Sequence, residues 1–266
     1  MTQTARTKVF FTSDAHLGSG YHQDPLAVEQ RLVRWLQHIE PEARAVYFLG
    51  DMFDYWFEYR AVVPRGYVRF LGQVALMSDR GVEIHFFAGN HDVWFRDYVQ
   101  QELGAQVHHH ALECVLDGKR FRLAHGDEES QSEGWTSAFL YRLFRNPLAQ
   151  LLYGAVHPRW TVGFALNCSL RSRRKGLKRA TLGEVPHAYH NDYFDLEQET
   201  LIRWTKDYAA KHPEIDYYLF GHRHLLVDLA LRGDRRVLIL GDWLRYNSYA
   251  VWDGTALYLD QWEVED

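Results

Sequence analysis

Cysteine is scarce in this sequence: Cys114 and Cys168 are the two cysteines among 266 residues. They are too few for a disulfide framework, and this scarcity favours a reducing compartment. The sequence also lacks any run of about 18 consecutive apolar residues, so no transmembrane helix is predicted. Residues 1–11 contain no apolar stretch long enough for a signal peptide. We therefore expect a protein that is made and kept in the cytoplasm.

Acidic residues are missing from one long segment, residues 134–183, which contains no Asp or Glu. The same segment holds nine basic residues, whereas the rest of the chain carries 21 basic and 35 acidic residues. Its apolar residues have helical spacing, interrupted by Pro147 and Pro158. We interpret residues 134–183 as a helical cap inserted into a larger domain, with a surface that attracts anions.

The rest of the composition is that of a folded protein, with 47% hydrophobic and 15% aromatic residues. This material is enough for a sizeable core, and it argues against disorder. Amphipathic stretches at 26–39 and 66–79 have apolar residues at three- and four-residue spacing, which predicts helices. Short apolar runs that predict strands occupy residues 8–11, 45–49, 83–88, 120–124, 216–220 and 236–240.

The alternation of these strands and helices indicates an α/β architecture. The last segment, residues 245–263, reads instead as a β-hairpin with Asp253 and Gly254 at its turn. No low-complexity linker divides the chain, so we expect a single domain over residues 1–266 that contains the cap.

Polar residues follow five of the predicted strands at the point where each strand ends. Because loops at the carboxyl ends of strands in an α/β sheet converge on one edge, we expect these residues to form one site. They comprise Asp14 and His16, Asp51, Asn90 and His91, His125, and His222 and His224. Any one of these clusters alone is typical of a surface turn. Together they offer more carboxylate, imidazole and amide ligands than one four-coordinate ion takes, and they suit two ions that share a carboxylate.

The motifs DAH, GDMFD, GNHD, HGD and GHRH, in this order, resemble those of the calcineurin-like metallophosphoesterases over nearly the whole chain. The resemblance implies a four-layer αββα sandwich of two mixed sheets and a dinuclear metal centre. It also implies the ligand sets: Asp14, His16, Asp51 and His224 for one ion, and Asp51, Asn90, His125 and His222 for the other. Such ligands suit Mn²⁺, Fe²⁺ or Zn²⁺, and we predict Mn²⁺.

The same resemblance assigns a catalytic role to His91, which follows the ligand Asn90. We expect His91 to protonate the leaving oxygen or to stabilise the phosphoryl charge, and Asp54 to hold its ring. Asp92 and Asp127 are expected to orient backbone and ligand groups around the metals.

Within the cap, the segments YRLFRNPLAQLLYGAVHPRW and SLRSRRKG resemble the cap of the UDP-2,3-diacylglucosamine hydrolases, a branch of this family that serves lipid A biosynthesis. The resemblance implies a dinuclear-metal hydrolase that splits the diphosphate of UDP-2,3-diacylglucosamine into UMP and 2,3-diacylglucosamine 1-phosphate. An apolar groove would then hold the acyl chains, lined by Phe139, Leu143, Phe144, Leu148, Leu151, Leu152, Trp160, Val162 and Phe164.

Polar contacts to this nucleotide-linked glycolipid are expected from Asn90, Tyr141, Arg145, Arg171, Arg173, Arg174 and Lys175. The basic, aromatic face of the cap also favours an anionic membrane surface, so we expect peripheral association with the inner face of the inner membrane.

An alternative is a metal-dependent phosphodiesterase that acts on nucleic acid or on another nucleotide-linked substrate. The basic block would then follow a phosphate backbone. Because its basic residues are interleaved with aliphatic ones, we do not expect nucleic acid as a partner. No obligate protein partner is inferred from the sequence. A third alternative is a scaffold that keeps the fold without the metals. The complete ligand set argues against it.

Overall fold

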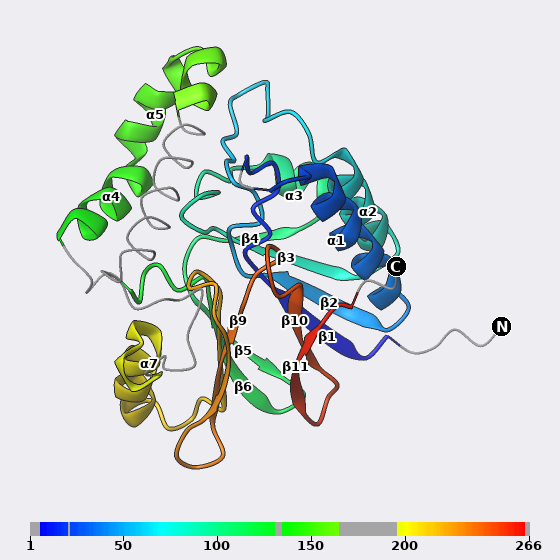
Figure 1. Ribbon diagram of the computed structural model, residues 1–266, viewed down its shortest axis with the longest axis vertical. Helices are drawn as coiled ribbons and strands as arrows, with labels where there is room; N and C mark the ends of the chain where they lie inside the picture. Colours follow the sequence, from blue (N-terminus) through cyan, green and yellow to red (C-terminus); the bar gives the residue numbers. More distant parts are fainter. Residues whose placement is uncertain (1–5, 21, 131–134, 165–195, 264–266) are drawn as a thin grey trace.

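The computed structural model describes residues 6–20, 22–130, 135–164 and 196–263, which form two β-sheets with helices on their outer faces (Figure 1). The first sheet has the strand order β11-β10-β1-β2-β3-β4. Strands β1 to β4 run parallel, and the C-terminal hairpin adds β10 antiparallel to β1. Their bounds are β1 Lys8–Thr12, β2 Ala43–Phe48, β3 Glu83–Phe87, β4 Gln106–His108, β10 Ser248–Trp252 and β11 Leu257–Gln261.

The second sheet has the order β5-β6-β7-β9-β8. Strands β6, β7 and β9 are parallel, and β5 and β8 close the two edges in antiparallel orientation. Their bounds are β5 Leu112–Leu116, β6 Lys119–Ala124, β7 Tyr217–Phe220, β8 Leu226–Ala230 and β9 Arg236–Leu240. Both sheets are therefore mixed, as the sequence predicts.

Alternating side chains of the strands build three layers of core. In β1, Phe10 points toward the helices on the first sheet, whereas Phe11 points into the layer between the sheets. In β7, Leu219 contributes to the same central layer, and Phe220 packs toward the helix on the far side. Because successive side chains of a strand point to opposite faces, apolar runs without polar interruption produce sheets that are covered on both sides.

Helices α1 (Pro25–Ile39), α2 (Val68–Asp79) and α3 (Tyr98–Leu103) cover the first sheet, and α7 (Thr200–Lys211) covers the second. The layer order is the predicted αββα. Helix α1 begins where Asp24 accepts hydrogen bonds from two backbone N–H groups of the first turn, with Pro25 at the first helical position. Helix α2 begins two residues later than the sequence predicts, because Gly66 and Tyr67 have left-handed backbone conformations.

The described part of the predicted cap is helical. Helices α4 (Trp135–Arg145) and α5 (Pro147–Ala155) are joined at Asn146, whose side chain caps α5, and residues 158–164 form a further helical stretch. Helices α4 and α5 lie on one side of the sandwich, at the upper left of Figure 1. Residues 134 and 165–183 of the predicted cap lie outside the described residues, and the single-domain boundary stays a prediction. Among the described helices, none combines the length and apolar character needed to cross a membrane.

Candidate metal centre

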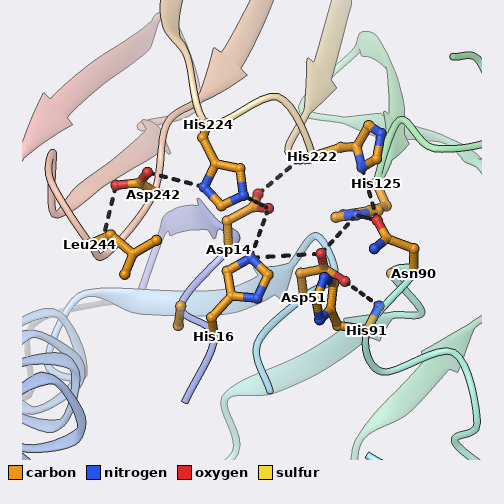
Figure 2. Close-up of polar contacts among 12 residues, drawn as sticks. Asp14, His16, Asp51, Asn90, His91, His125, His222, His224, Asp242 and Leu244 are labelled. Carbon is orange, nitrogen blue, oxygen red and sulfur yellow. Dashed lines mark hydrogen bonds and ion pairs between the residues drawn. The ribbon is translucent and has the colours of Figure 1, made fainter. Parts of the chain in front are cut away.

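Side chains from five strand ends meet at one place (Figure 2). Asp14 and His16 follow β1, Asp51 follows β2, and Asn90 follows β3, all in the first sheet. The remaining three, His125, His222 and His224, follow β6 and β7 in the second sheet. The sequence predicts that the site lies at one edge of a single sheet. The structure instead builds the site from the carboxyl ends of both sheets, which lie on the same side of the sandwich.

One group of ligand atoms surrounds Asp14. The imidazole Nε2 of His16 lies 3.7 Å from Asp14 Oδ1 and 3.7 Å from Asp51 Oδ2, and His224 Nε2 lies 3.6 Å from Asp14 Oδ1. Asp14 and His16 are completely buried. Asp14 Oδ1 accepts no hydrogen bond from any described residue. A buried carboxylate oxygen in this condition carries a large desolvation cost unless a cation occupies the site.

A second group surrounds Asn90. Its Oδ1 lies 2.9 Å from His222 Nδ1 and 3.3 Å from His125 Nε2, and the same His125 nitrogen lies 3.5 Å from Asp51 Oδ2. Asp51 Oδ2 therefore faces both groups. The spacings of 3.5 to 3.7 Å are too long for hydrogen bonds. They are close to those expected between neighbouring ligand atoms that each lie about 2.0–2.2 Å from a shared ion. The donor set fits two divalent ions.

Electrostatics at the site favour a cation. Burial alone would raise the pKa of Asp14, but the neighbouring His224 and His16 lower it to about 2. Burial likewise opposes ionisation of Asp51, yet His125 and His91 hold its pKa well below the usual value. Burial, together with the proximity of His125, lowers the pKa of His222 to about 3. Two ionised buried carboxylates and a neutral His222 are protonation states that metal binding requires. Burial opposes the charged form of His125, but the neighbouring Asp51 raises the pKa of that ring well above its usual value, so an ion that binds there displaces a proton from His125.

Backbone conformation explains how short loops aim these ligands. Asp14, His16, Asp51, His222 and His224 all have positive φ, between 43° and 66°. This left-handed region is uncommon for residues other than glycine, although Asp and His enter it more easily than most. Such strain collects at functional sites, where surrounding contacts hold it in place.

Glycines allow the strand ends to approach one another. A Cβ on Gly221 would lie 2.4 Å from Asp14 Oδ2, and a Cβ on Gly89 would lie 2.2 Å from Asp51 Oδ1. Gly50, with φ of 88°, would place a Cβ 2.5 Å from His125 Nδ1. At each of these positions, a side chain larger than hydrogen would overlap a candidate ligand side chain from a neighbouring strand end.

A family model described as calcineurin-like phosphoesterase matches residues 7–226, which include every residue of both ligand groups. The chain belongs to the calcineurin-like phosphoesterase family. Members of this family bind divalent metal ions. In this chain Asp14, His16 and His224 form one candidate position and Asp14, Asp51 and His125 form another. Asn90 and His222 lie beside the second.

Curated relatives give a narrower comparison. A protein of Porphyromonas gingivalis (strain ATCC BAA-308 / W83) named UDP-2,3-diacylglucosamine hydrolase is 67% identical over 97% of this chain and 98% of its own. A protein of the same name from Nitrosococcus oceani is 27% identical over 90% of this chain and 88% of its own. A third protein of this name, from Edwardsiella ictaluri (strain 93-146), is 26% identical over 94% of this chain and 90% of its own.

Asp92 and Leu49, which are outside the predicted ligand set, fix the positions of loops and ligands at the site through hydrogen bonds. Asp92 is completely buried and accepts hydrogen bonds from four backbone N–H groups, those of Asp51, Met52, Phe53 and Gly89. It therefore ties the loop after β2 to the loop after β3. The backbone carbonyl of Leu49 lies 2.8 Å from His125 Nδ1 and fixes that ring with Nε2 toward Asp51.

Sequence reasoning missed Asp242, whose Oδ2 lies 3.0 Å from His224 Nδ1 (Figure 2). It follows β9, in the same Gly–Asp arrangement that marks Asp51 after β2. The Gly–Asp pair after β9 could have identified Asp242 from the sequence. β9 is one of the predicted strands, and its carboxyl end lies on the same side as those of β6 and β7.

His91 lies at the edge of the site and is half-buried. Its Nδ1 is 3.0 Å from the backbone carbonyl of Asp54 and 3.7 Å from Asp54 Oδ1. Asp54 is predicted to hold the ring of His91. Its backbone carbonyl lies closer to that ring than its carboxylate does. The carboxylate also lies 3.6 Å from His16 Nδ1. His91 belongs as well to a third possible ligand group with His16 and Asp51.

The predicted substrate-binding residues of the cap are only partly described. The guanidinium of Arg145 lies 3.0 Å from Asp127 Oδ2 and stacks 3.9 Å from the ring centre of Tyr141. Arg145 therefore already has a carboxylate partner, which anchors α4 beside the site. The other basic residues of that prediction, Arg171, Arg173, Arg174 and Lys175, lie outside the described residues.

The apolar residues predicted to form the cap groove are mostly exposed. Leu148, Leu151, Leu152, Trp160 and Phe164 have exposed fractions of 66 to 73%. None of the residues of α5 is buried. A cavity of about 810 Å³ lies between the cap and the sandwich, lined on one side by residues 62–67 and on the other by His157, Pro158, Arg159 and Val162. Leu17, which directly follows His16 in the sequence, also lines it.

Proposed function

We propose that this chain is a dinuclear-metal hydrolase that cleaves the diphosphate of UDP-2,3-diacylglucosamine to UMP and 2,3-diacylglucosamine 1-phosphate. The observation that carries the proposal is the presence of a mostly apolar cavity and a set of convergent metal-ligand side chains in the same domain, because a nucleotide-linked glycolipid needs both. The 67% identical relative, whose name specifies this substrate, supports the same choice over almost the full length of both chains.

The metal ligands would divide as the family resemblance implies. Asp14, His16 and His224 would hold one ion, Asn90, His125 and His222 the other, and Asp51 would bridge them. When bound, a pair of divalent ions, here proposed to be Mn²⁺, activates a water molecule and neutralises phosphoryl charge. The chain's own contribution is to keep His222 neutral, the carboxylates of Asp14 and Asp51 ionised and the ligand atoms in fixed positions.

His91 is proposed to act on the phosphoryl group or on the leaving oxygen. Because a carbonyl oxygen only accepts hydrogen bonds, the contact with Asp54 requires that His91 Nδ1 donates. Nε2 is then the nitrogen that we propose to act on the substrate. A half-buried imidazole in this orientation can donate a hydrogen bond or a proton when it is charged.

The cavity between the cap and the sandwich is proposed to take the acyl chains. Its walls include the rings of Tyr55, Tyr59 and Tyr67 and the side chains of Val62 and Val162. Each methylene buried there would contribute about 0.8 kcal/mol to binding. Arg65 and Arg159 also line the cavity and would favour the negatively charged end of the same molecule.

The exposed apolar residues of α5 and of residues 158–164 are proposed to rest on the inner face of the inner membrane, where the substrate is embedded. Trp160 is 73% exposed and Arg159 is its neighbour, a combination suited to the boundary between lipid headgroups and acyl chains. The protein would then be cytoplasmic and peripherally associated.

Incubation of the purified protein with Mn²⁺ and UDP-2,3-diacylglucosamine, followed by mass spectrometry, tests this proposal. We expect UMP and the lipid monophosphate in equal amounts, with a KM that rises as the acyl chains are shortened. Cleavage of a DNA oligonucleotide at comparable efficiency, lost steeply with added salt, would contradict the lipid assignment and favour a nucleic-acid phosphodiesterase.

A further inference from the structure

We infer that Asp242 is a positioning residue that sets the affinity of one ion of the proposed metal centre, through His224. The inference rests on the proposed centre, and it adds a residue that is outside the expected ligand set. Asp242 is almost completely buried at 1% exposure, and it begins the turn that follows β9.

Its two carboxylate oxygens have different tasks. Oδ2 lies 3.0 Å from His224 Nδ1. Oδ1 accepts hydrogen bonds from the backbone N–H groups of Leu244, Arg245 and Tyr246, at 3.1, 2.7 and 3.3 Å. Three donors on one oxygen prevent the carboxylate from rotating, so the other oxygen stays directed at the imidazole (Figure 2).

The turn that carries Asp242 is itself attached to the first ligand strand. The backbone N–H of Trp243 donates to the backbone carbonyl of Asp14 at 3.2 Å, and its indole N–H donates to Thr12 Oγ1 at 2.7 Å. Asp242 and Asp14, whose carboxylates face His224 from opposite sides, are therefore connected through the hydrogen bonds of Trp243. The distance from His224 Nε2 to Asp14 Oδ1 is 3.6 Å.

This arrangement determines which nitrogen of His224 is free. A carboxylate only accepts hydrogen bonds, so the contact with Asp242 requires a proton on Nδ1. In the neutral ring Nε2 then carries the lone pair, and Nε2 is the atom that faces Asp14. A carboxylate behind a ligating imidazole fixes the tautomer and increases the basicity of the ligand.

Asp242→Asn is the sharpest test, because the side chain keeps its shape and reverses one hydrogen bond. The amide oxygen can still accept from the turn, whereas the amide nitrogen donates toward His224 Nδ1. The proton of a neutral His224 must then move to Nε2 and block the ligand position. We expect equilibrium dialysis against graded Mn²⁺ to show one of two ions bound about 10–100-fold more weakly. The Tm of the metal-free protein should stay near that of the wild type.

Asp253→Asn is the matched control. Asp253 Oδ1 also accepts backbone N–H groups of a turn, those of Thr255 and Ala256 at 2.8 Å each, but in the C-terminal hairpin. This variant should bind two ions with wild-type affinity. In a double-mutant cycle, Asp242→Asn added to His224→Ala should weaken metal binding no further than His224→Ala alone, because both changes act through the same ligand.

The possible failures are distinguishable. A wild-type protein that binds no ion would overturn the metal centre together with this inference. A wild-type protein with two ions, and an Asp242→Asn variant that binds both equally well, would overturn the inference alone. Equal weakening of both ions, or a metal-free Tm that falls sharply, would assign Asp242 a role in folding instead.

Discussion

At the scale of single residues, the ligands combine burial with an unusual backbone. Asp14 and His16 are completely buried, and both have positive φ. Burial and left-handed conformation each cost stability, and the site has both at the same residues. A bound cation would offset these costs in the native state, since ligand binding to the folded chain stabilises it.

The half-buried His91 gives the first prediction. His91→Ala should retain both ions and lower kcat by about 10²–10⁴, the range for loss of a general acid or base. Metal content by mass spectrometry and steady-state kinetics measure the two effects. His110→Ala, at an exposed histidine, is the control and should leave both unchanged. Loss of an ion from the His91 variant would show that His91 is a ligand in the third possible group, with His16 and Asp51.

Asp92 gives a prediction about stability. Asp92→Ala leaves four buried backbone N–H groups without their acceptor, so the free energy of unfolding should fall by at least about 3 kcal/mol. Urea denaturation measures this value. Asp97→Ala, at an exposed carboxylate that bonds only to Gln101 among the contacts described, should stay within about 0.5 kcal/mol of the wild type. Equal effects of the two substitutions would refute the proposed role of Asp92.

At the scale of elements, the close approach of strand ends makes glycine necessary beside the ligands. Gly221→Ala should displace Asp14, because the new Cβ would lie 2.4 Å from its carboxylate, and metal affinity should fall at least tenfold. Gly72→Ala is the matched control: nothing lies within 4 Å of its Cβ, and alanine in the middle of α2 should add about 0.5–1 kcal/mol of stability. Titration of each variant with Mn²⁺ checks this, and wild-type affinity in Gly221→Ala would contradict it.

The cap is joined to the loops after β2 and β3 by aromatic contacts. The ring of Tyr153 in α5 lies 5.0 Å from that of Phe57 and 4.8 Å from that of Trp94. Its hydroxyl donates to the carbonyl of Thr161 at 3.0 Å and lies 3.3 Å from the hydroxyl of Tyr55. Because Tyr55 directly follows Asp54, the position of the cap is linked to the loop that carries Asp51.

The six strands predicted from apolar runs are all present, because a strand buried on both faces reads as continuous apolar sequence. Strands β4, β5 and β8 were not predicted. β5 and β8 close the edges of the second sheet and β4 closes one edge of the first, with exposed or half-buried positions. Their pairing depends on neighbouring strands that no local pattern reveals.

The same limit applies to the site. The convergence of the seven candidate ligands was predictable because polar residues after apolar strands follow a general rule of α/β folds. The contact of Arg145 with Asp127 was not, because it depends on how α4 is placed against the loop after β6. The substrate-binding role of Arg145 therefore stays a prediction.

At the scale of the whole molecule, the layer between the two sheets contains a pair of imidazoles, of which His85 is buried and His108 is half-buried. His85 Nδ1 lies 3.1 Å from His108 Nε2, and the His85 ring stacks on Tyr47 at 4.1 Å. Burial, reinforced by the neighbouring His108, lowers the pKa of His85 to about 4. His85 is thus neutral in the folded protein, whereas in the unfolded chain it binds a proton near pH 6.5.

The stability that neutral His85 contributes is therefore lost progressively as the pH falls below about 6.5. The loss is complete once the pH is below about 4, where His85 is protonated in the folded protein too. His85→Phe, which keeps an aromatic ring on Tyr47, should make the free energy of unfolding fall less between pH 7 and pH 5. Urea denaturation at both values measures the difference. His38→Phe, at an exposed histidine of α1, should retain the wild-type slope. An unchanged slope for His85→Phe would contradict the burial argument.

The account depends on two ions at the place where both sheets end. Anomalous diffraction from crystals grown with Mn²⁺ tests this most directly. We predict two peaks, one among Asp14, His16 and His224 and one among Asn90, His125 and His222, with Asp51 in contact with both. A single peak elsewhere, or no peak at a saturating concentration of Mn²⁺, would contradict the account.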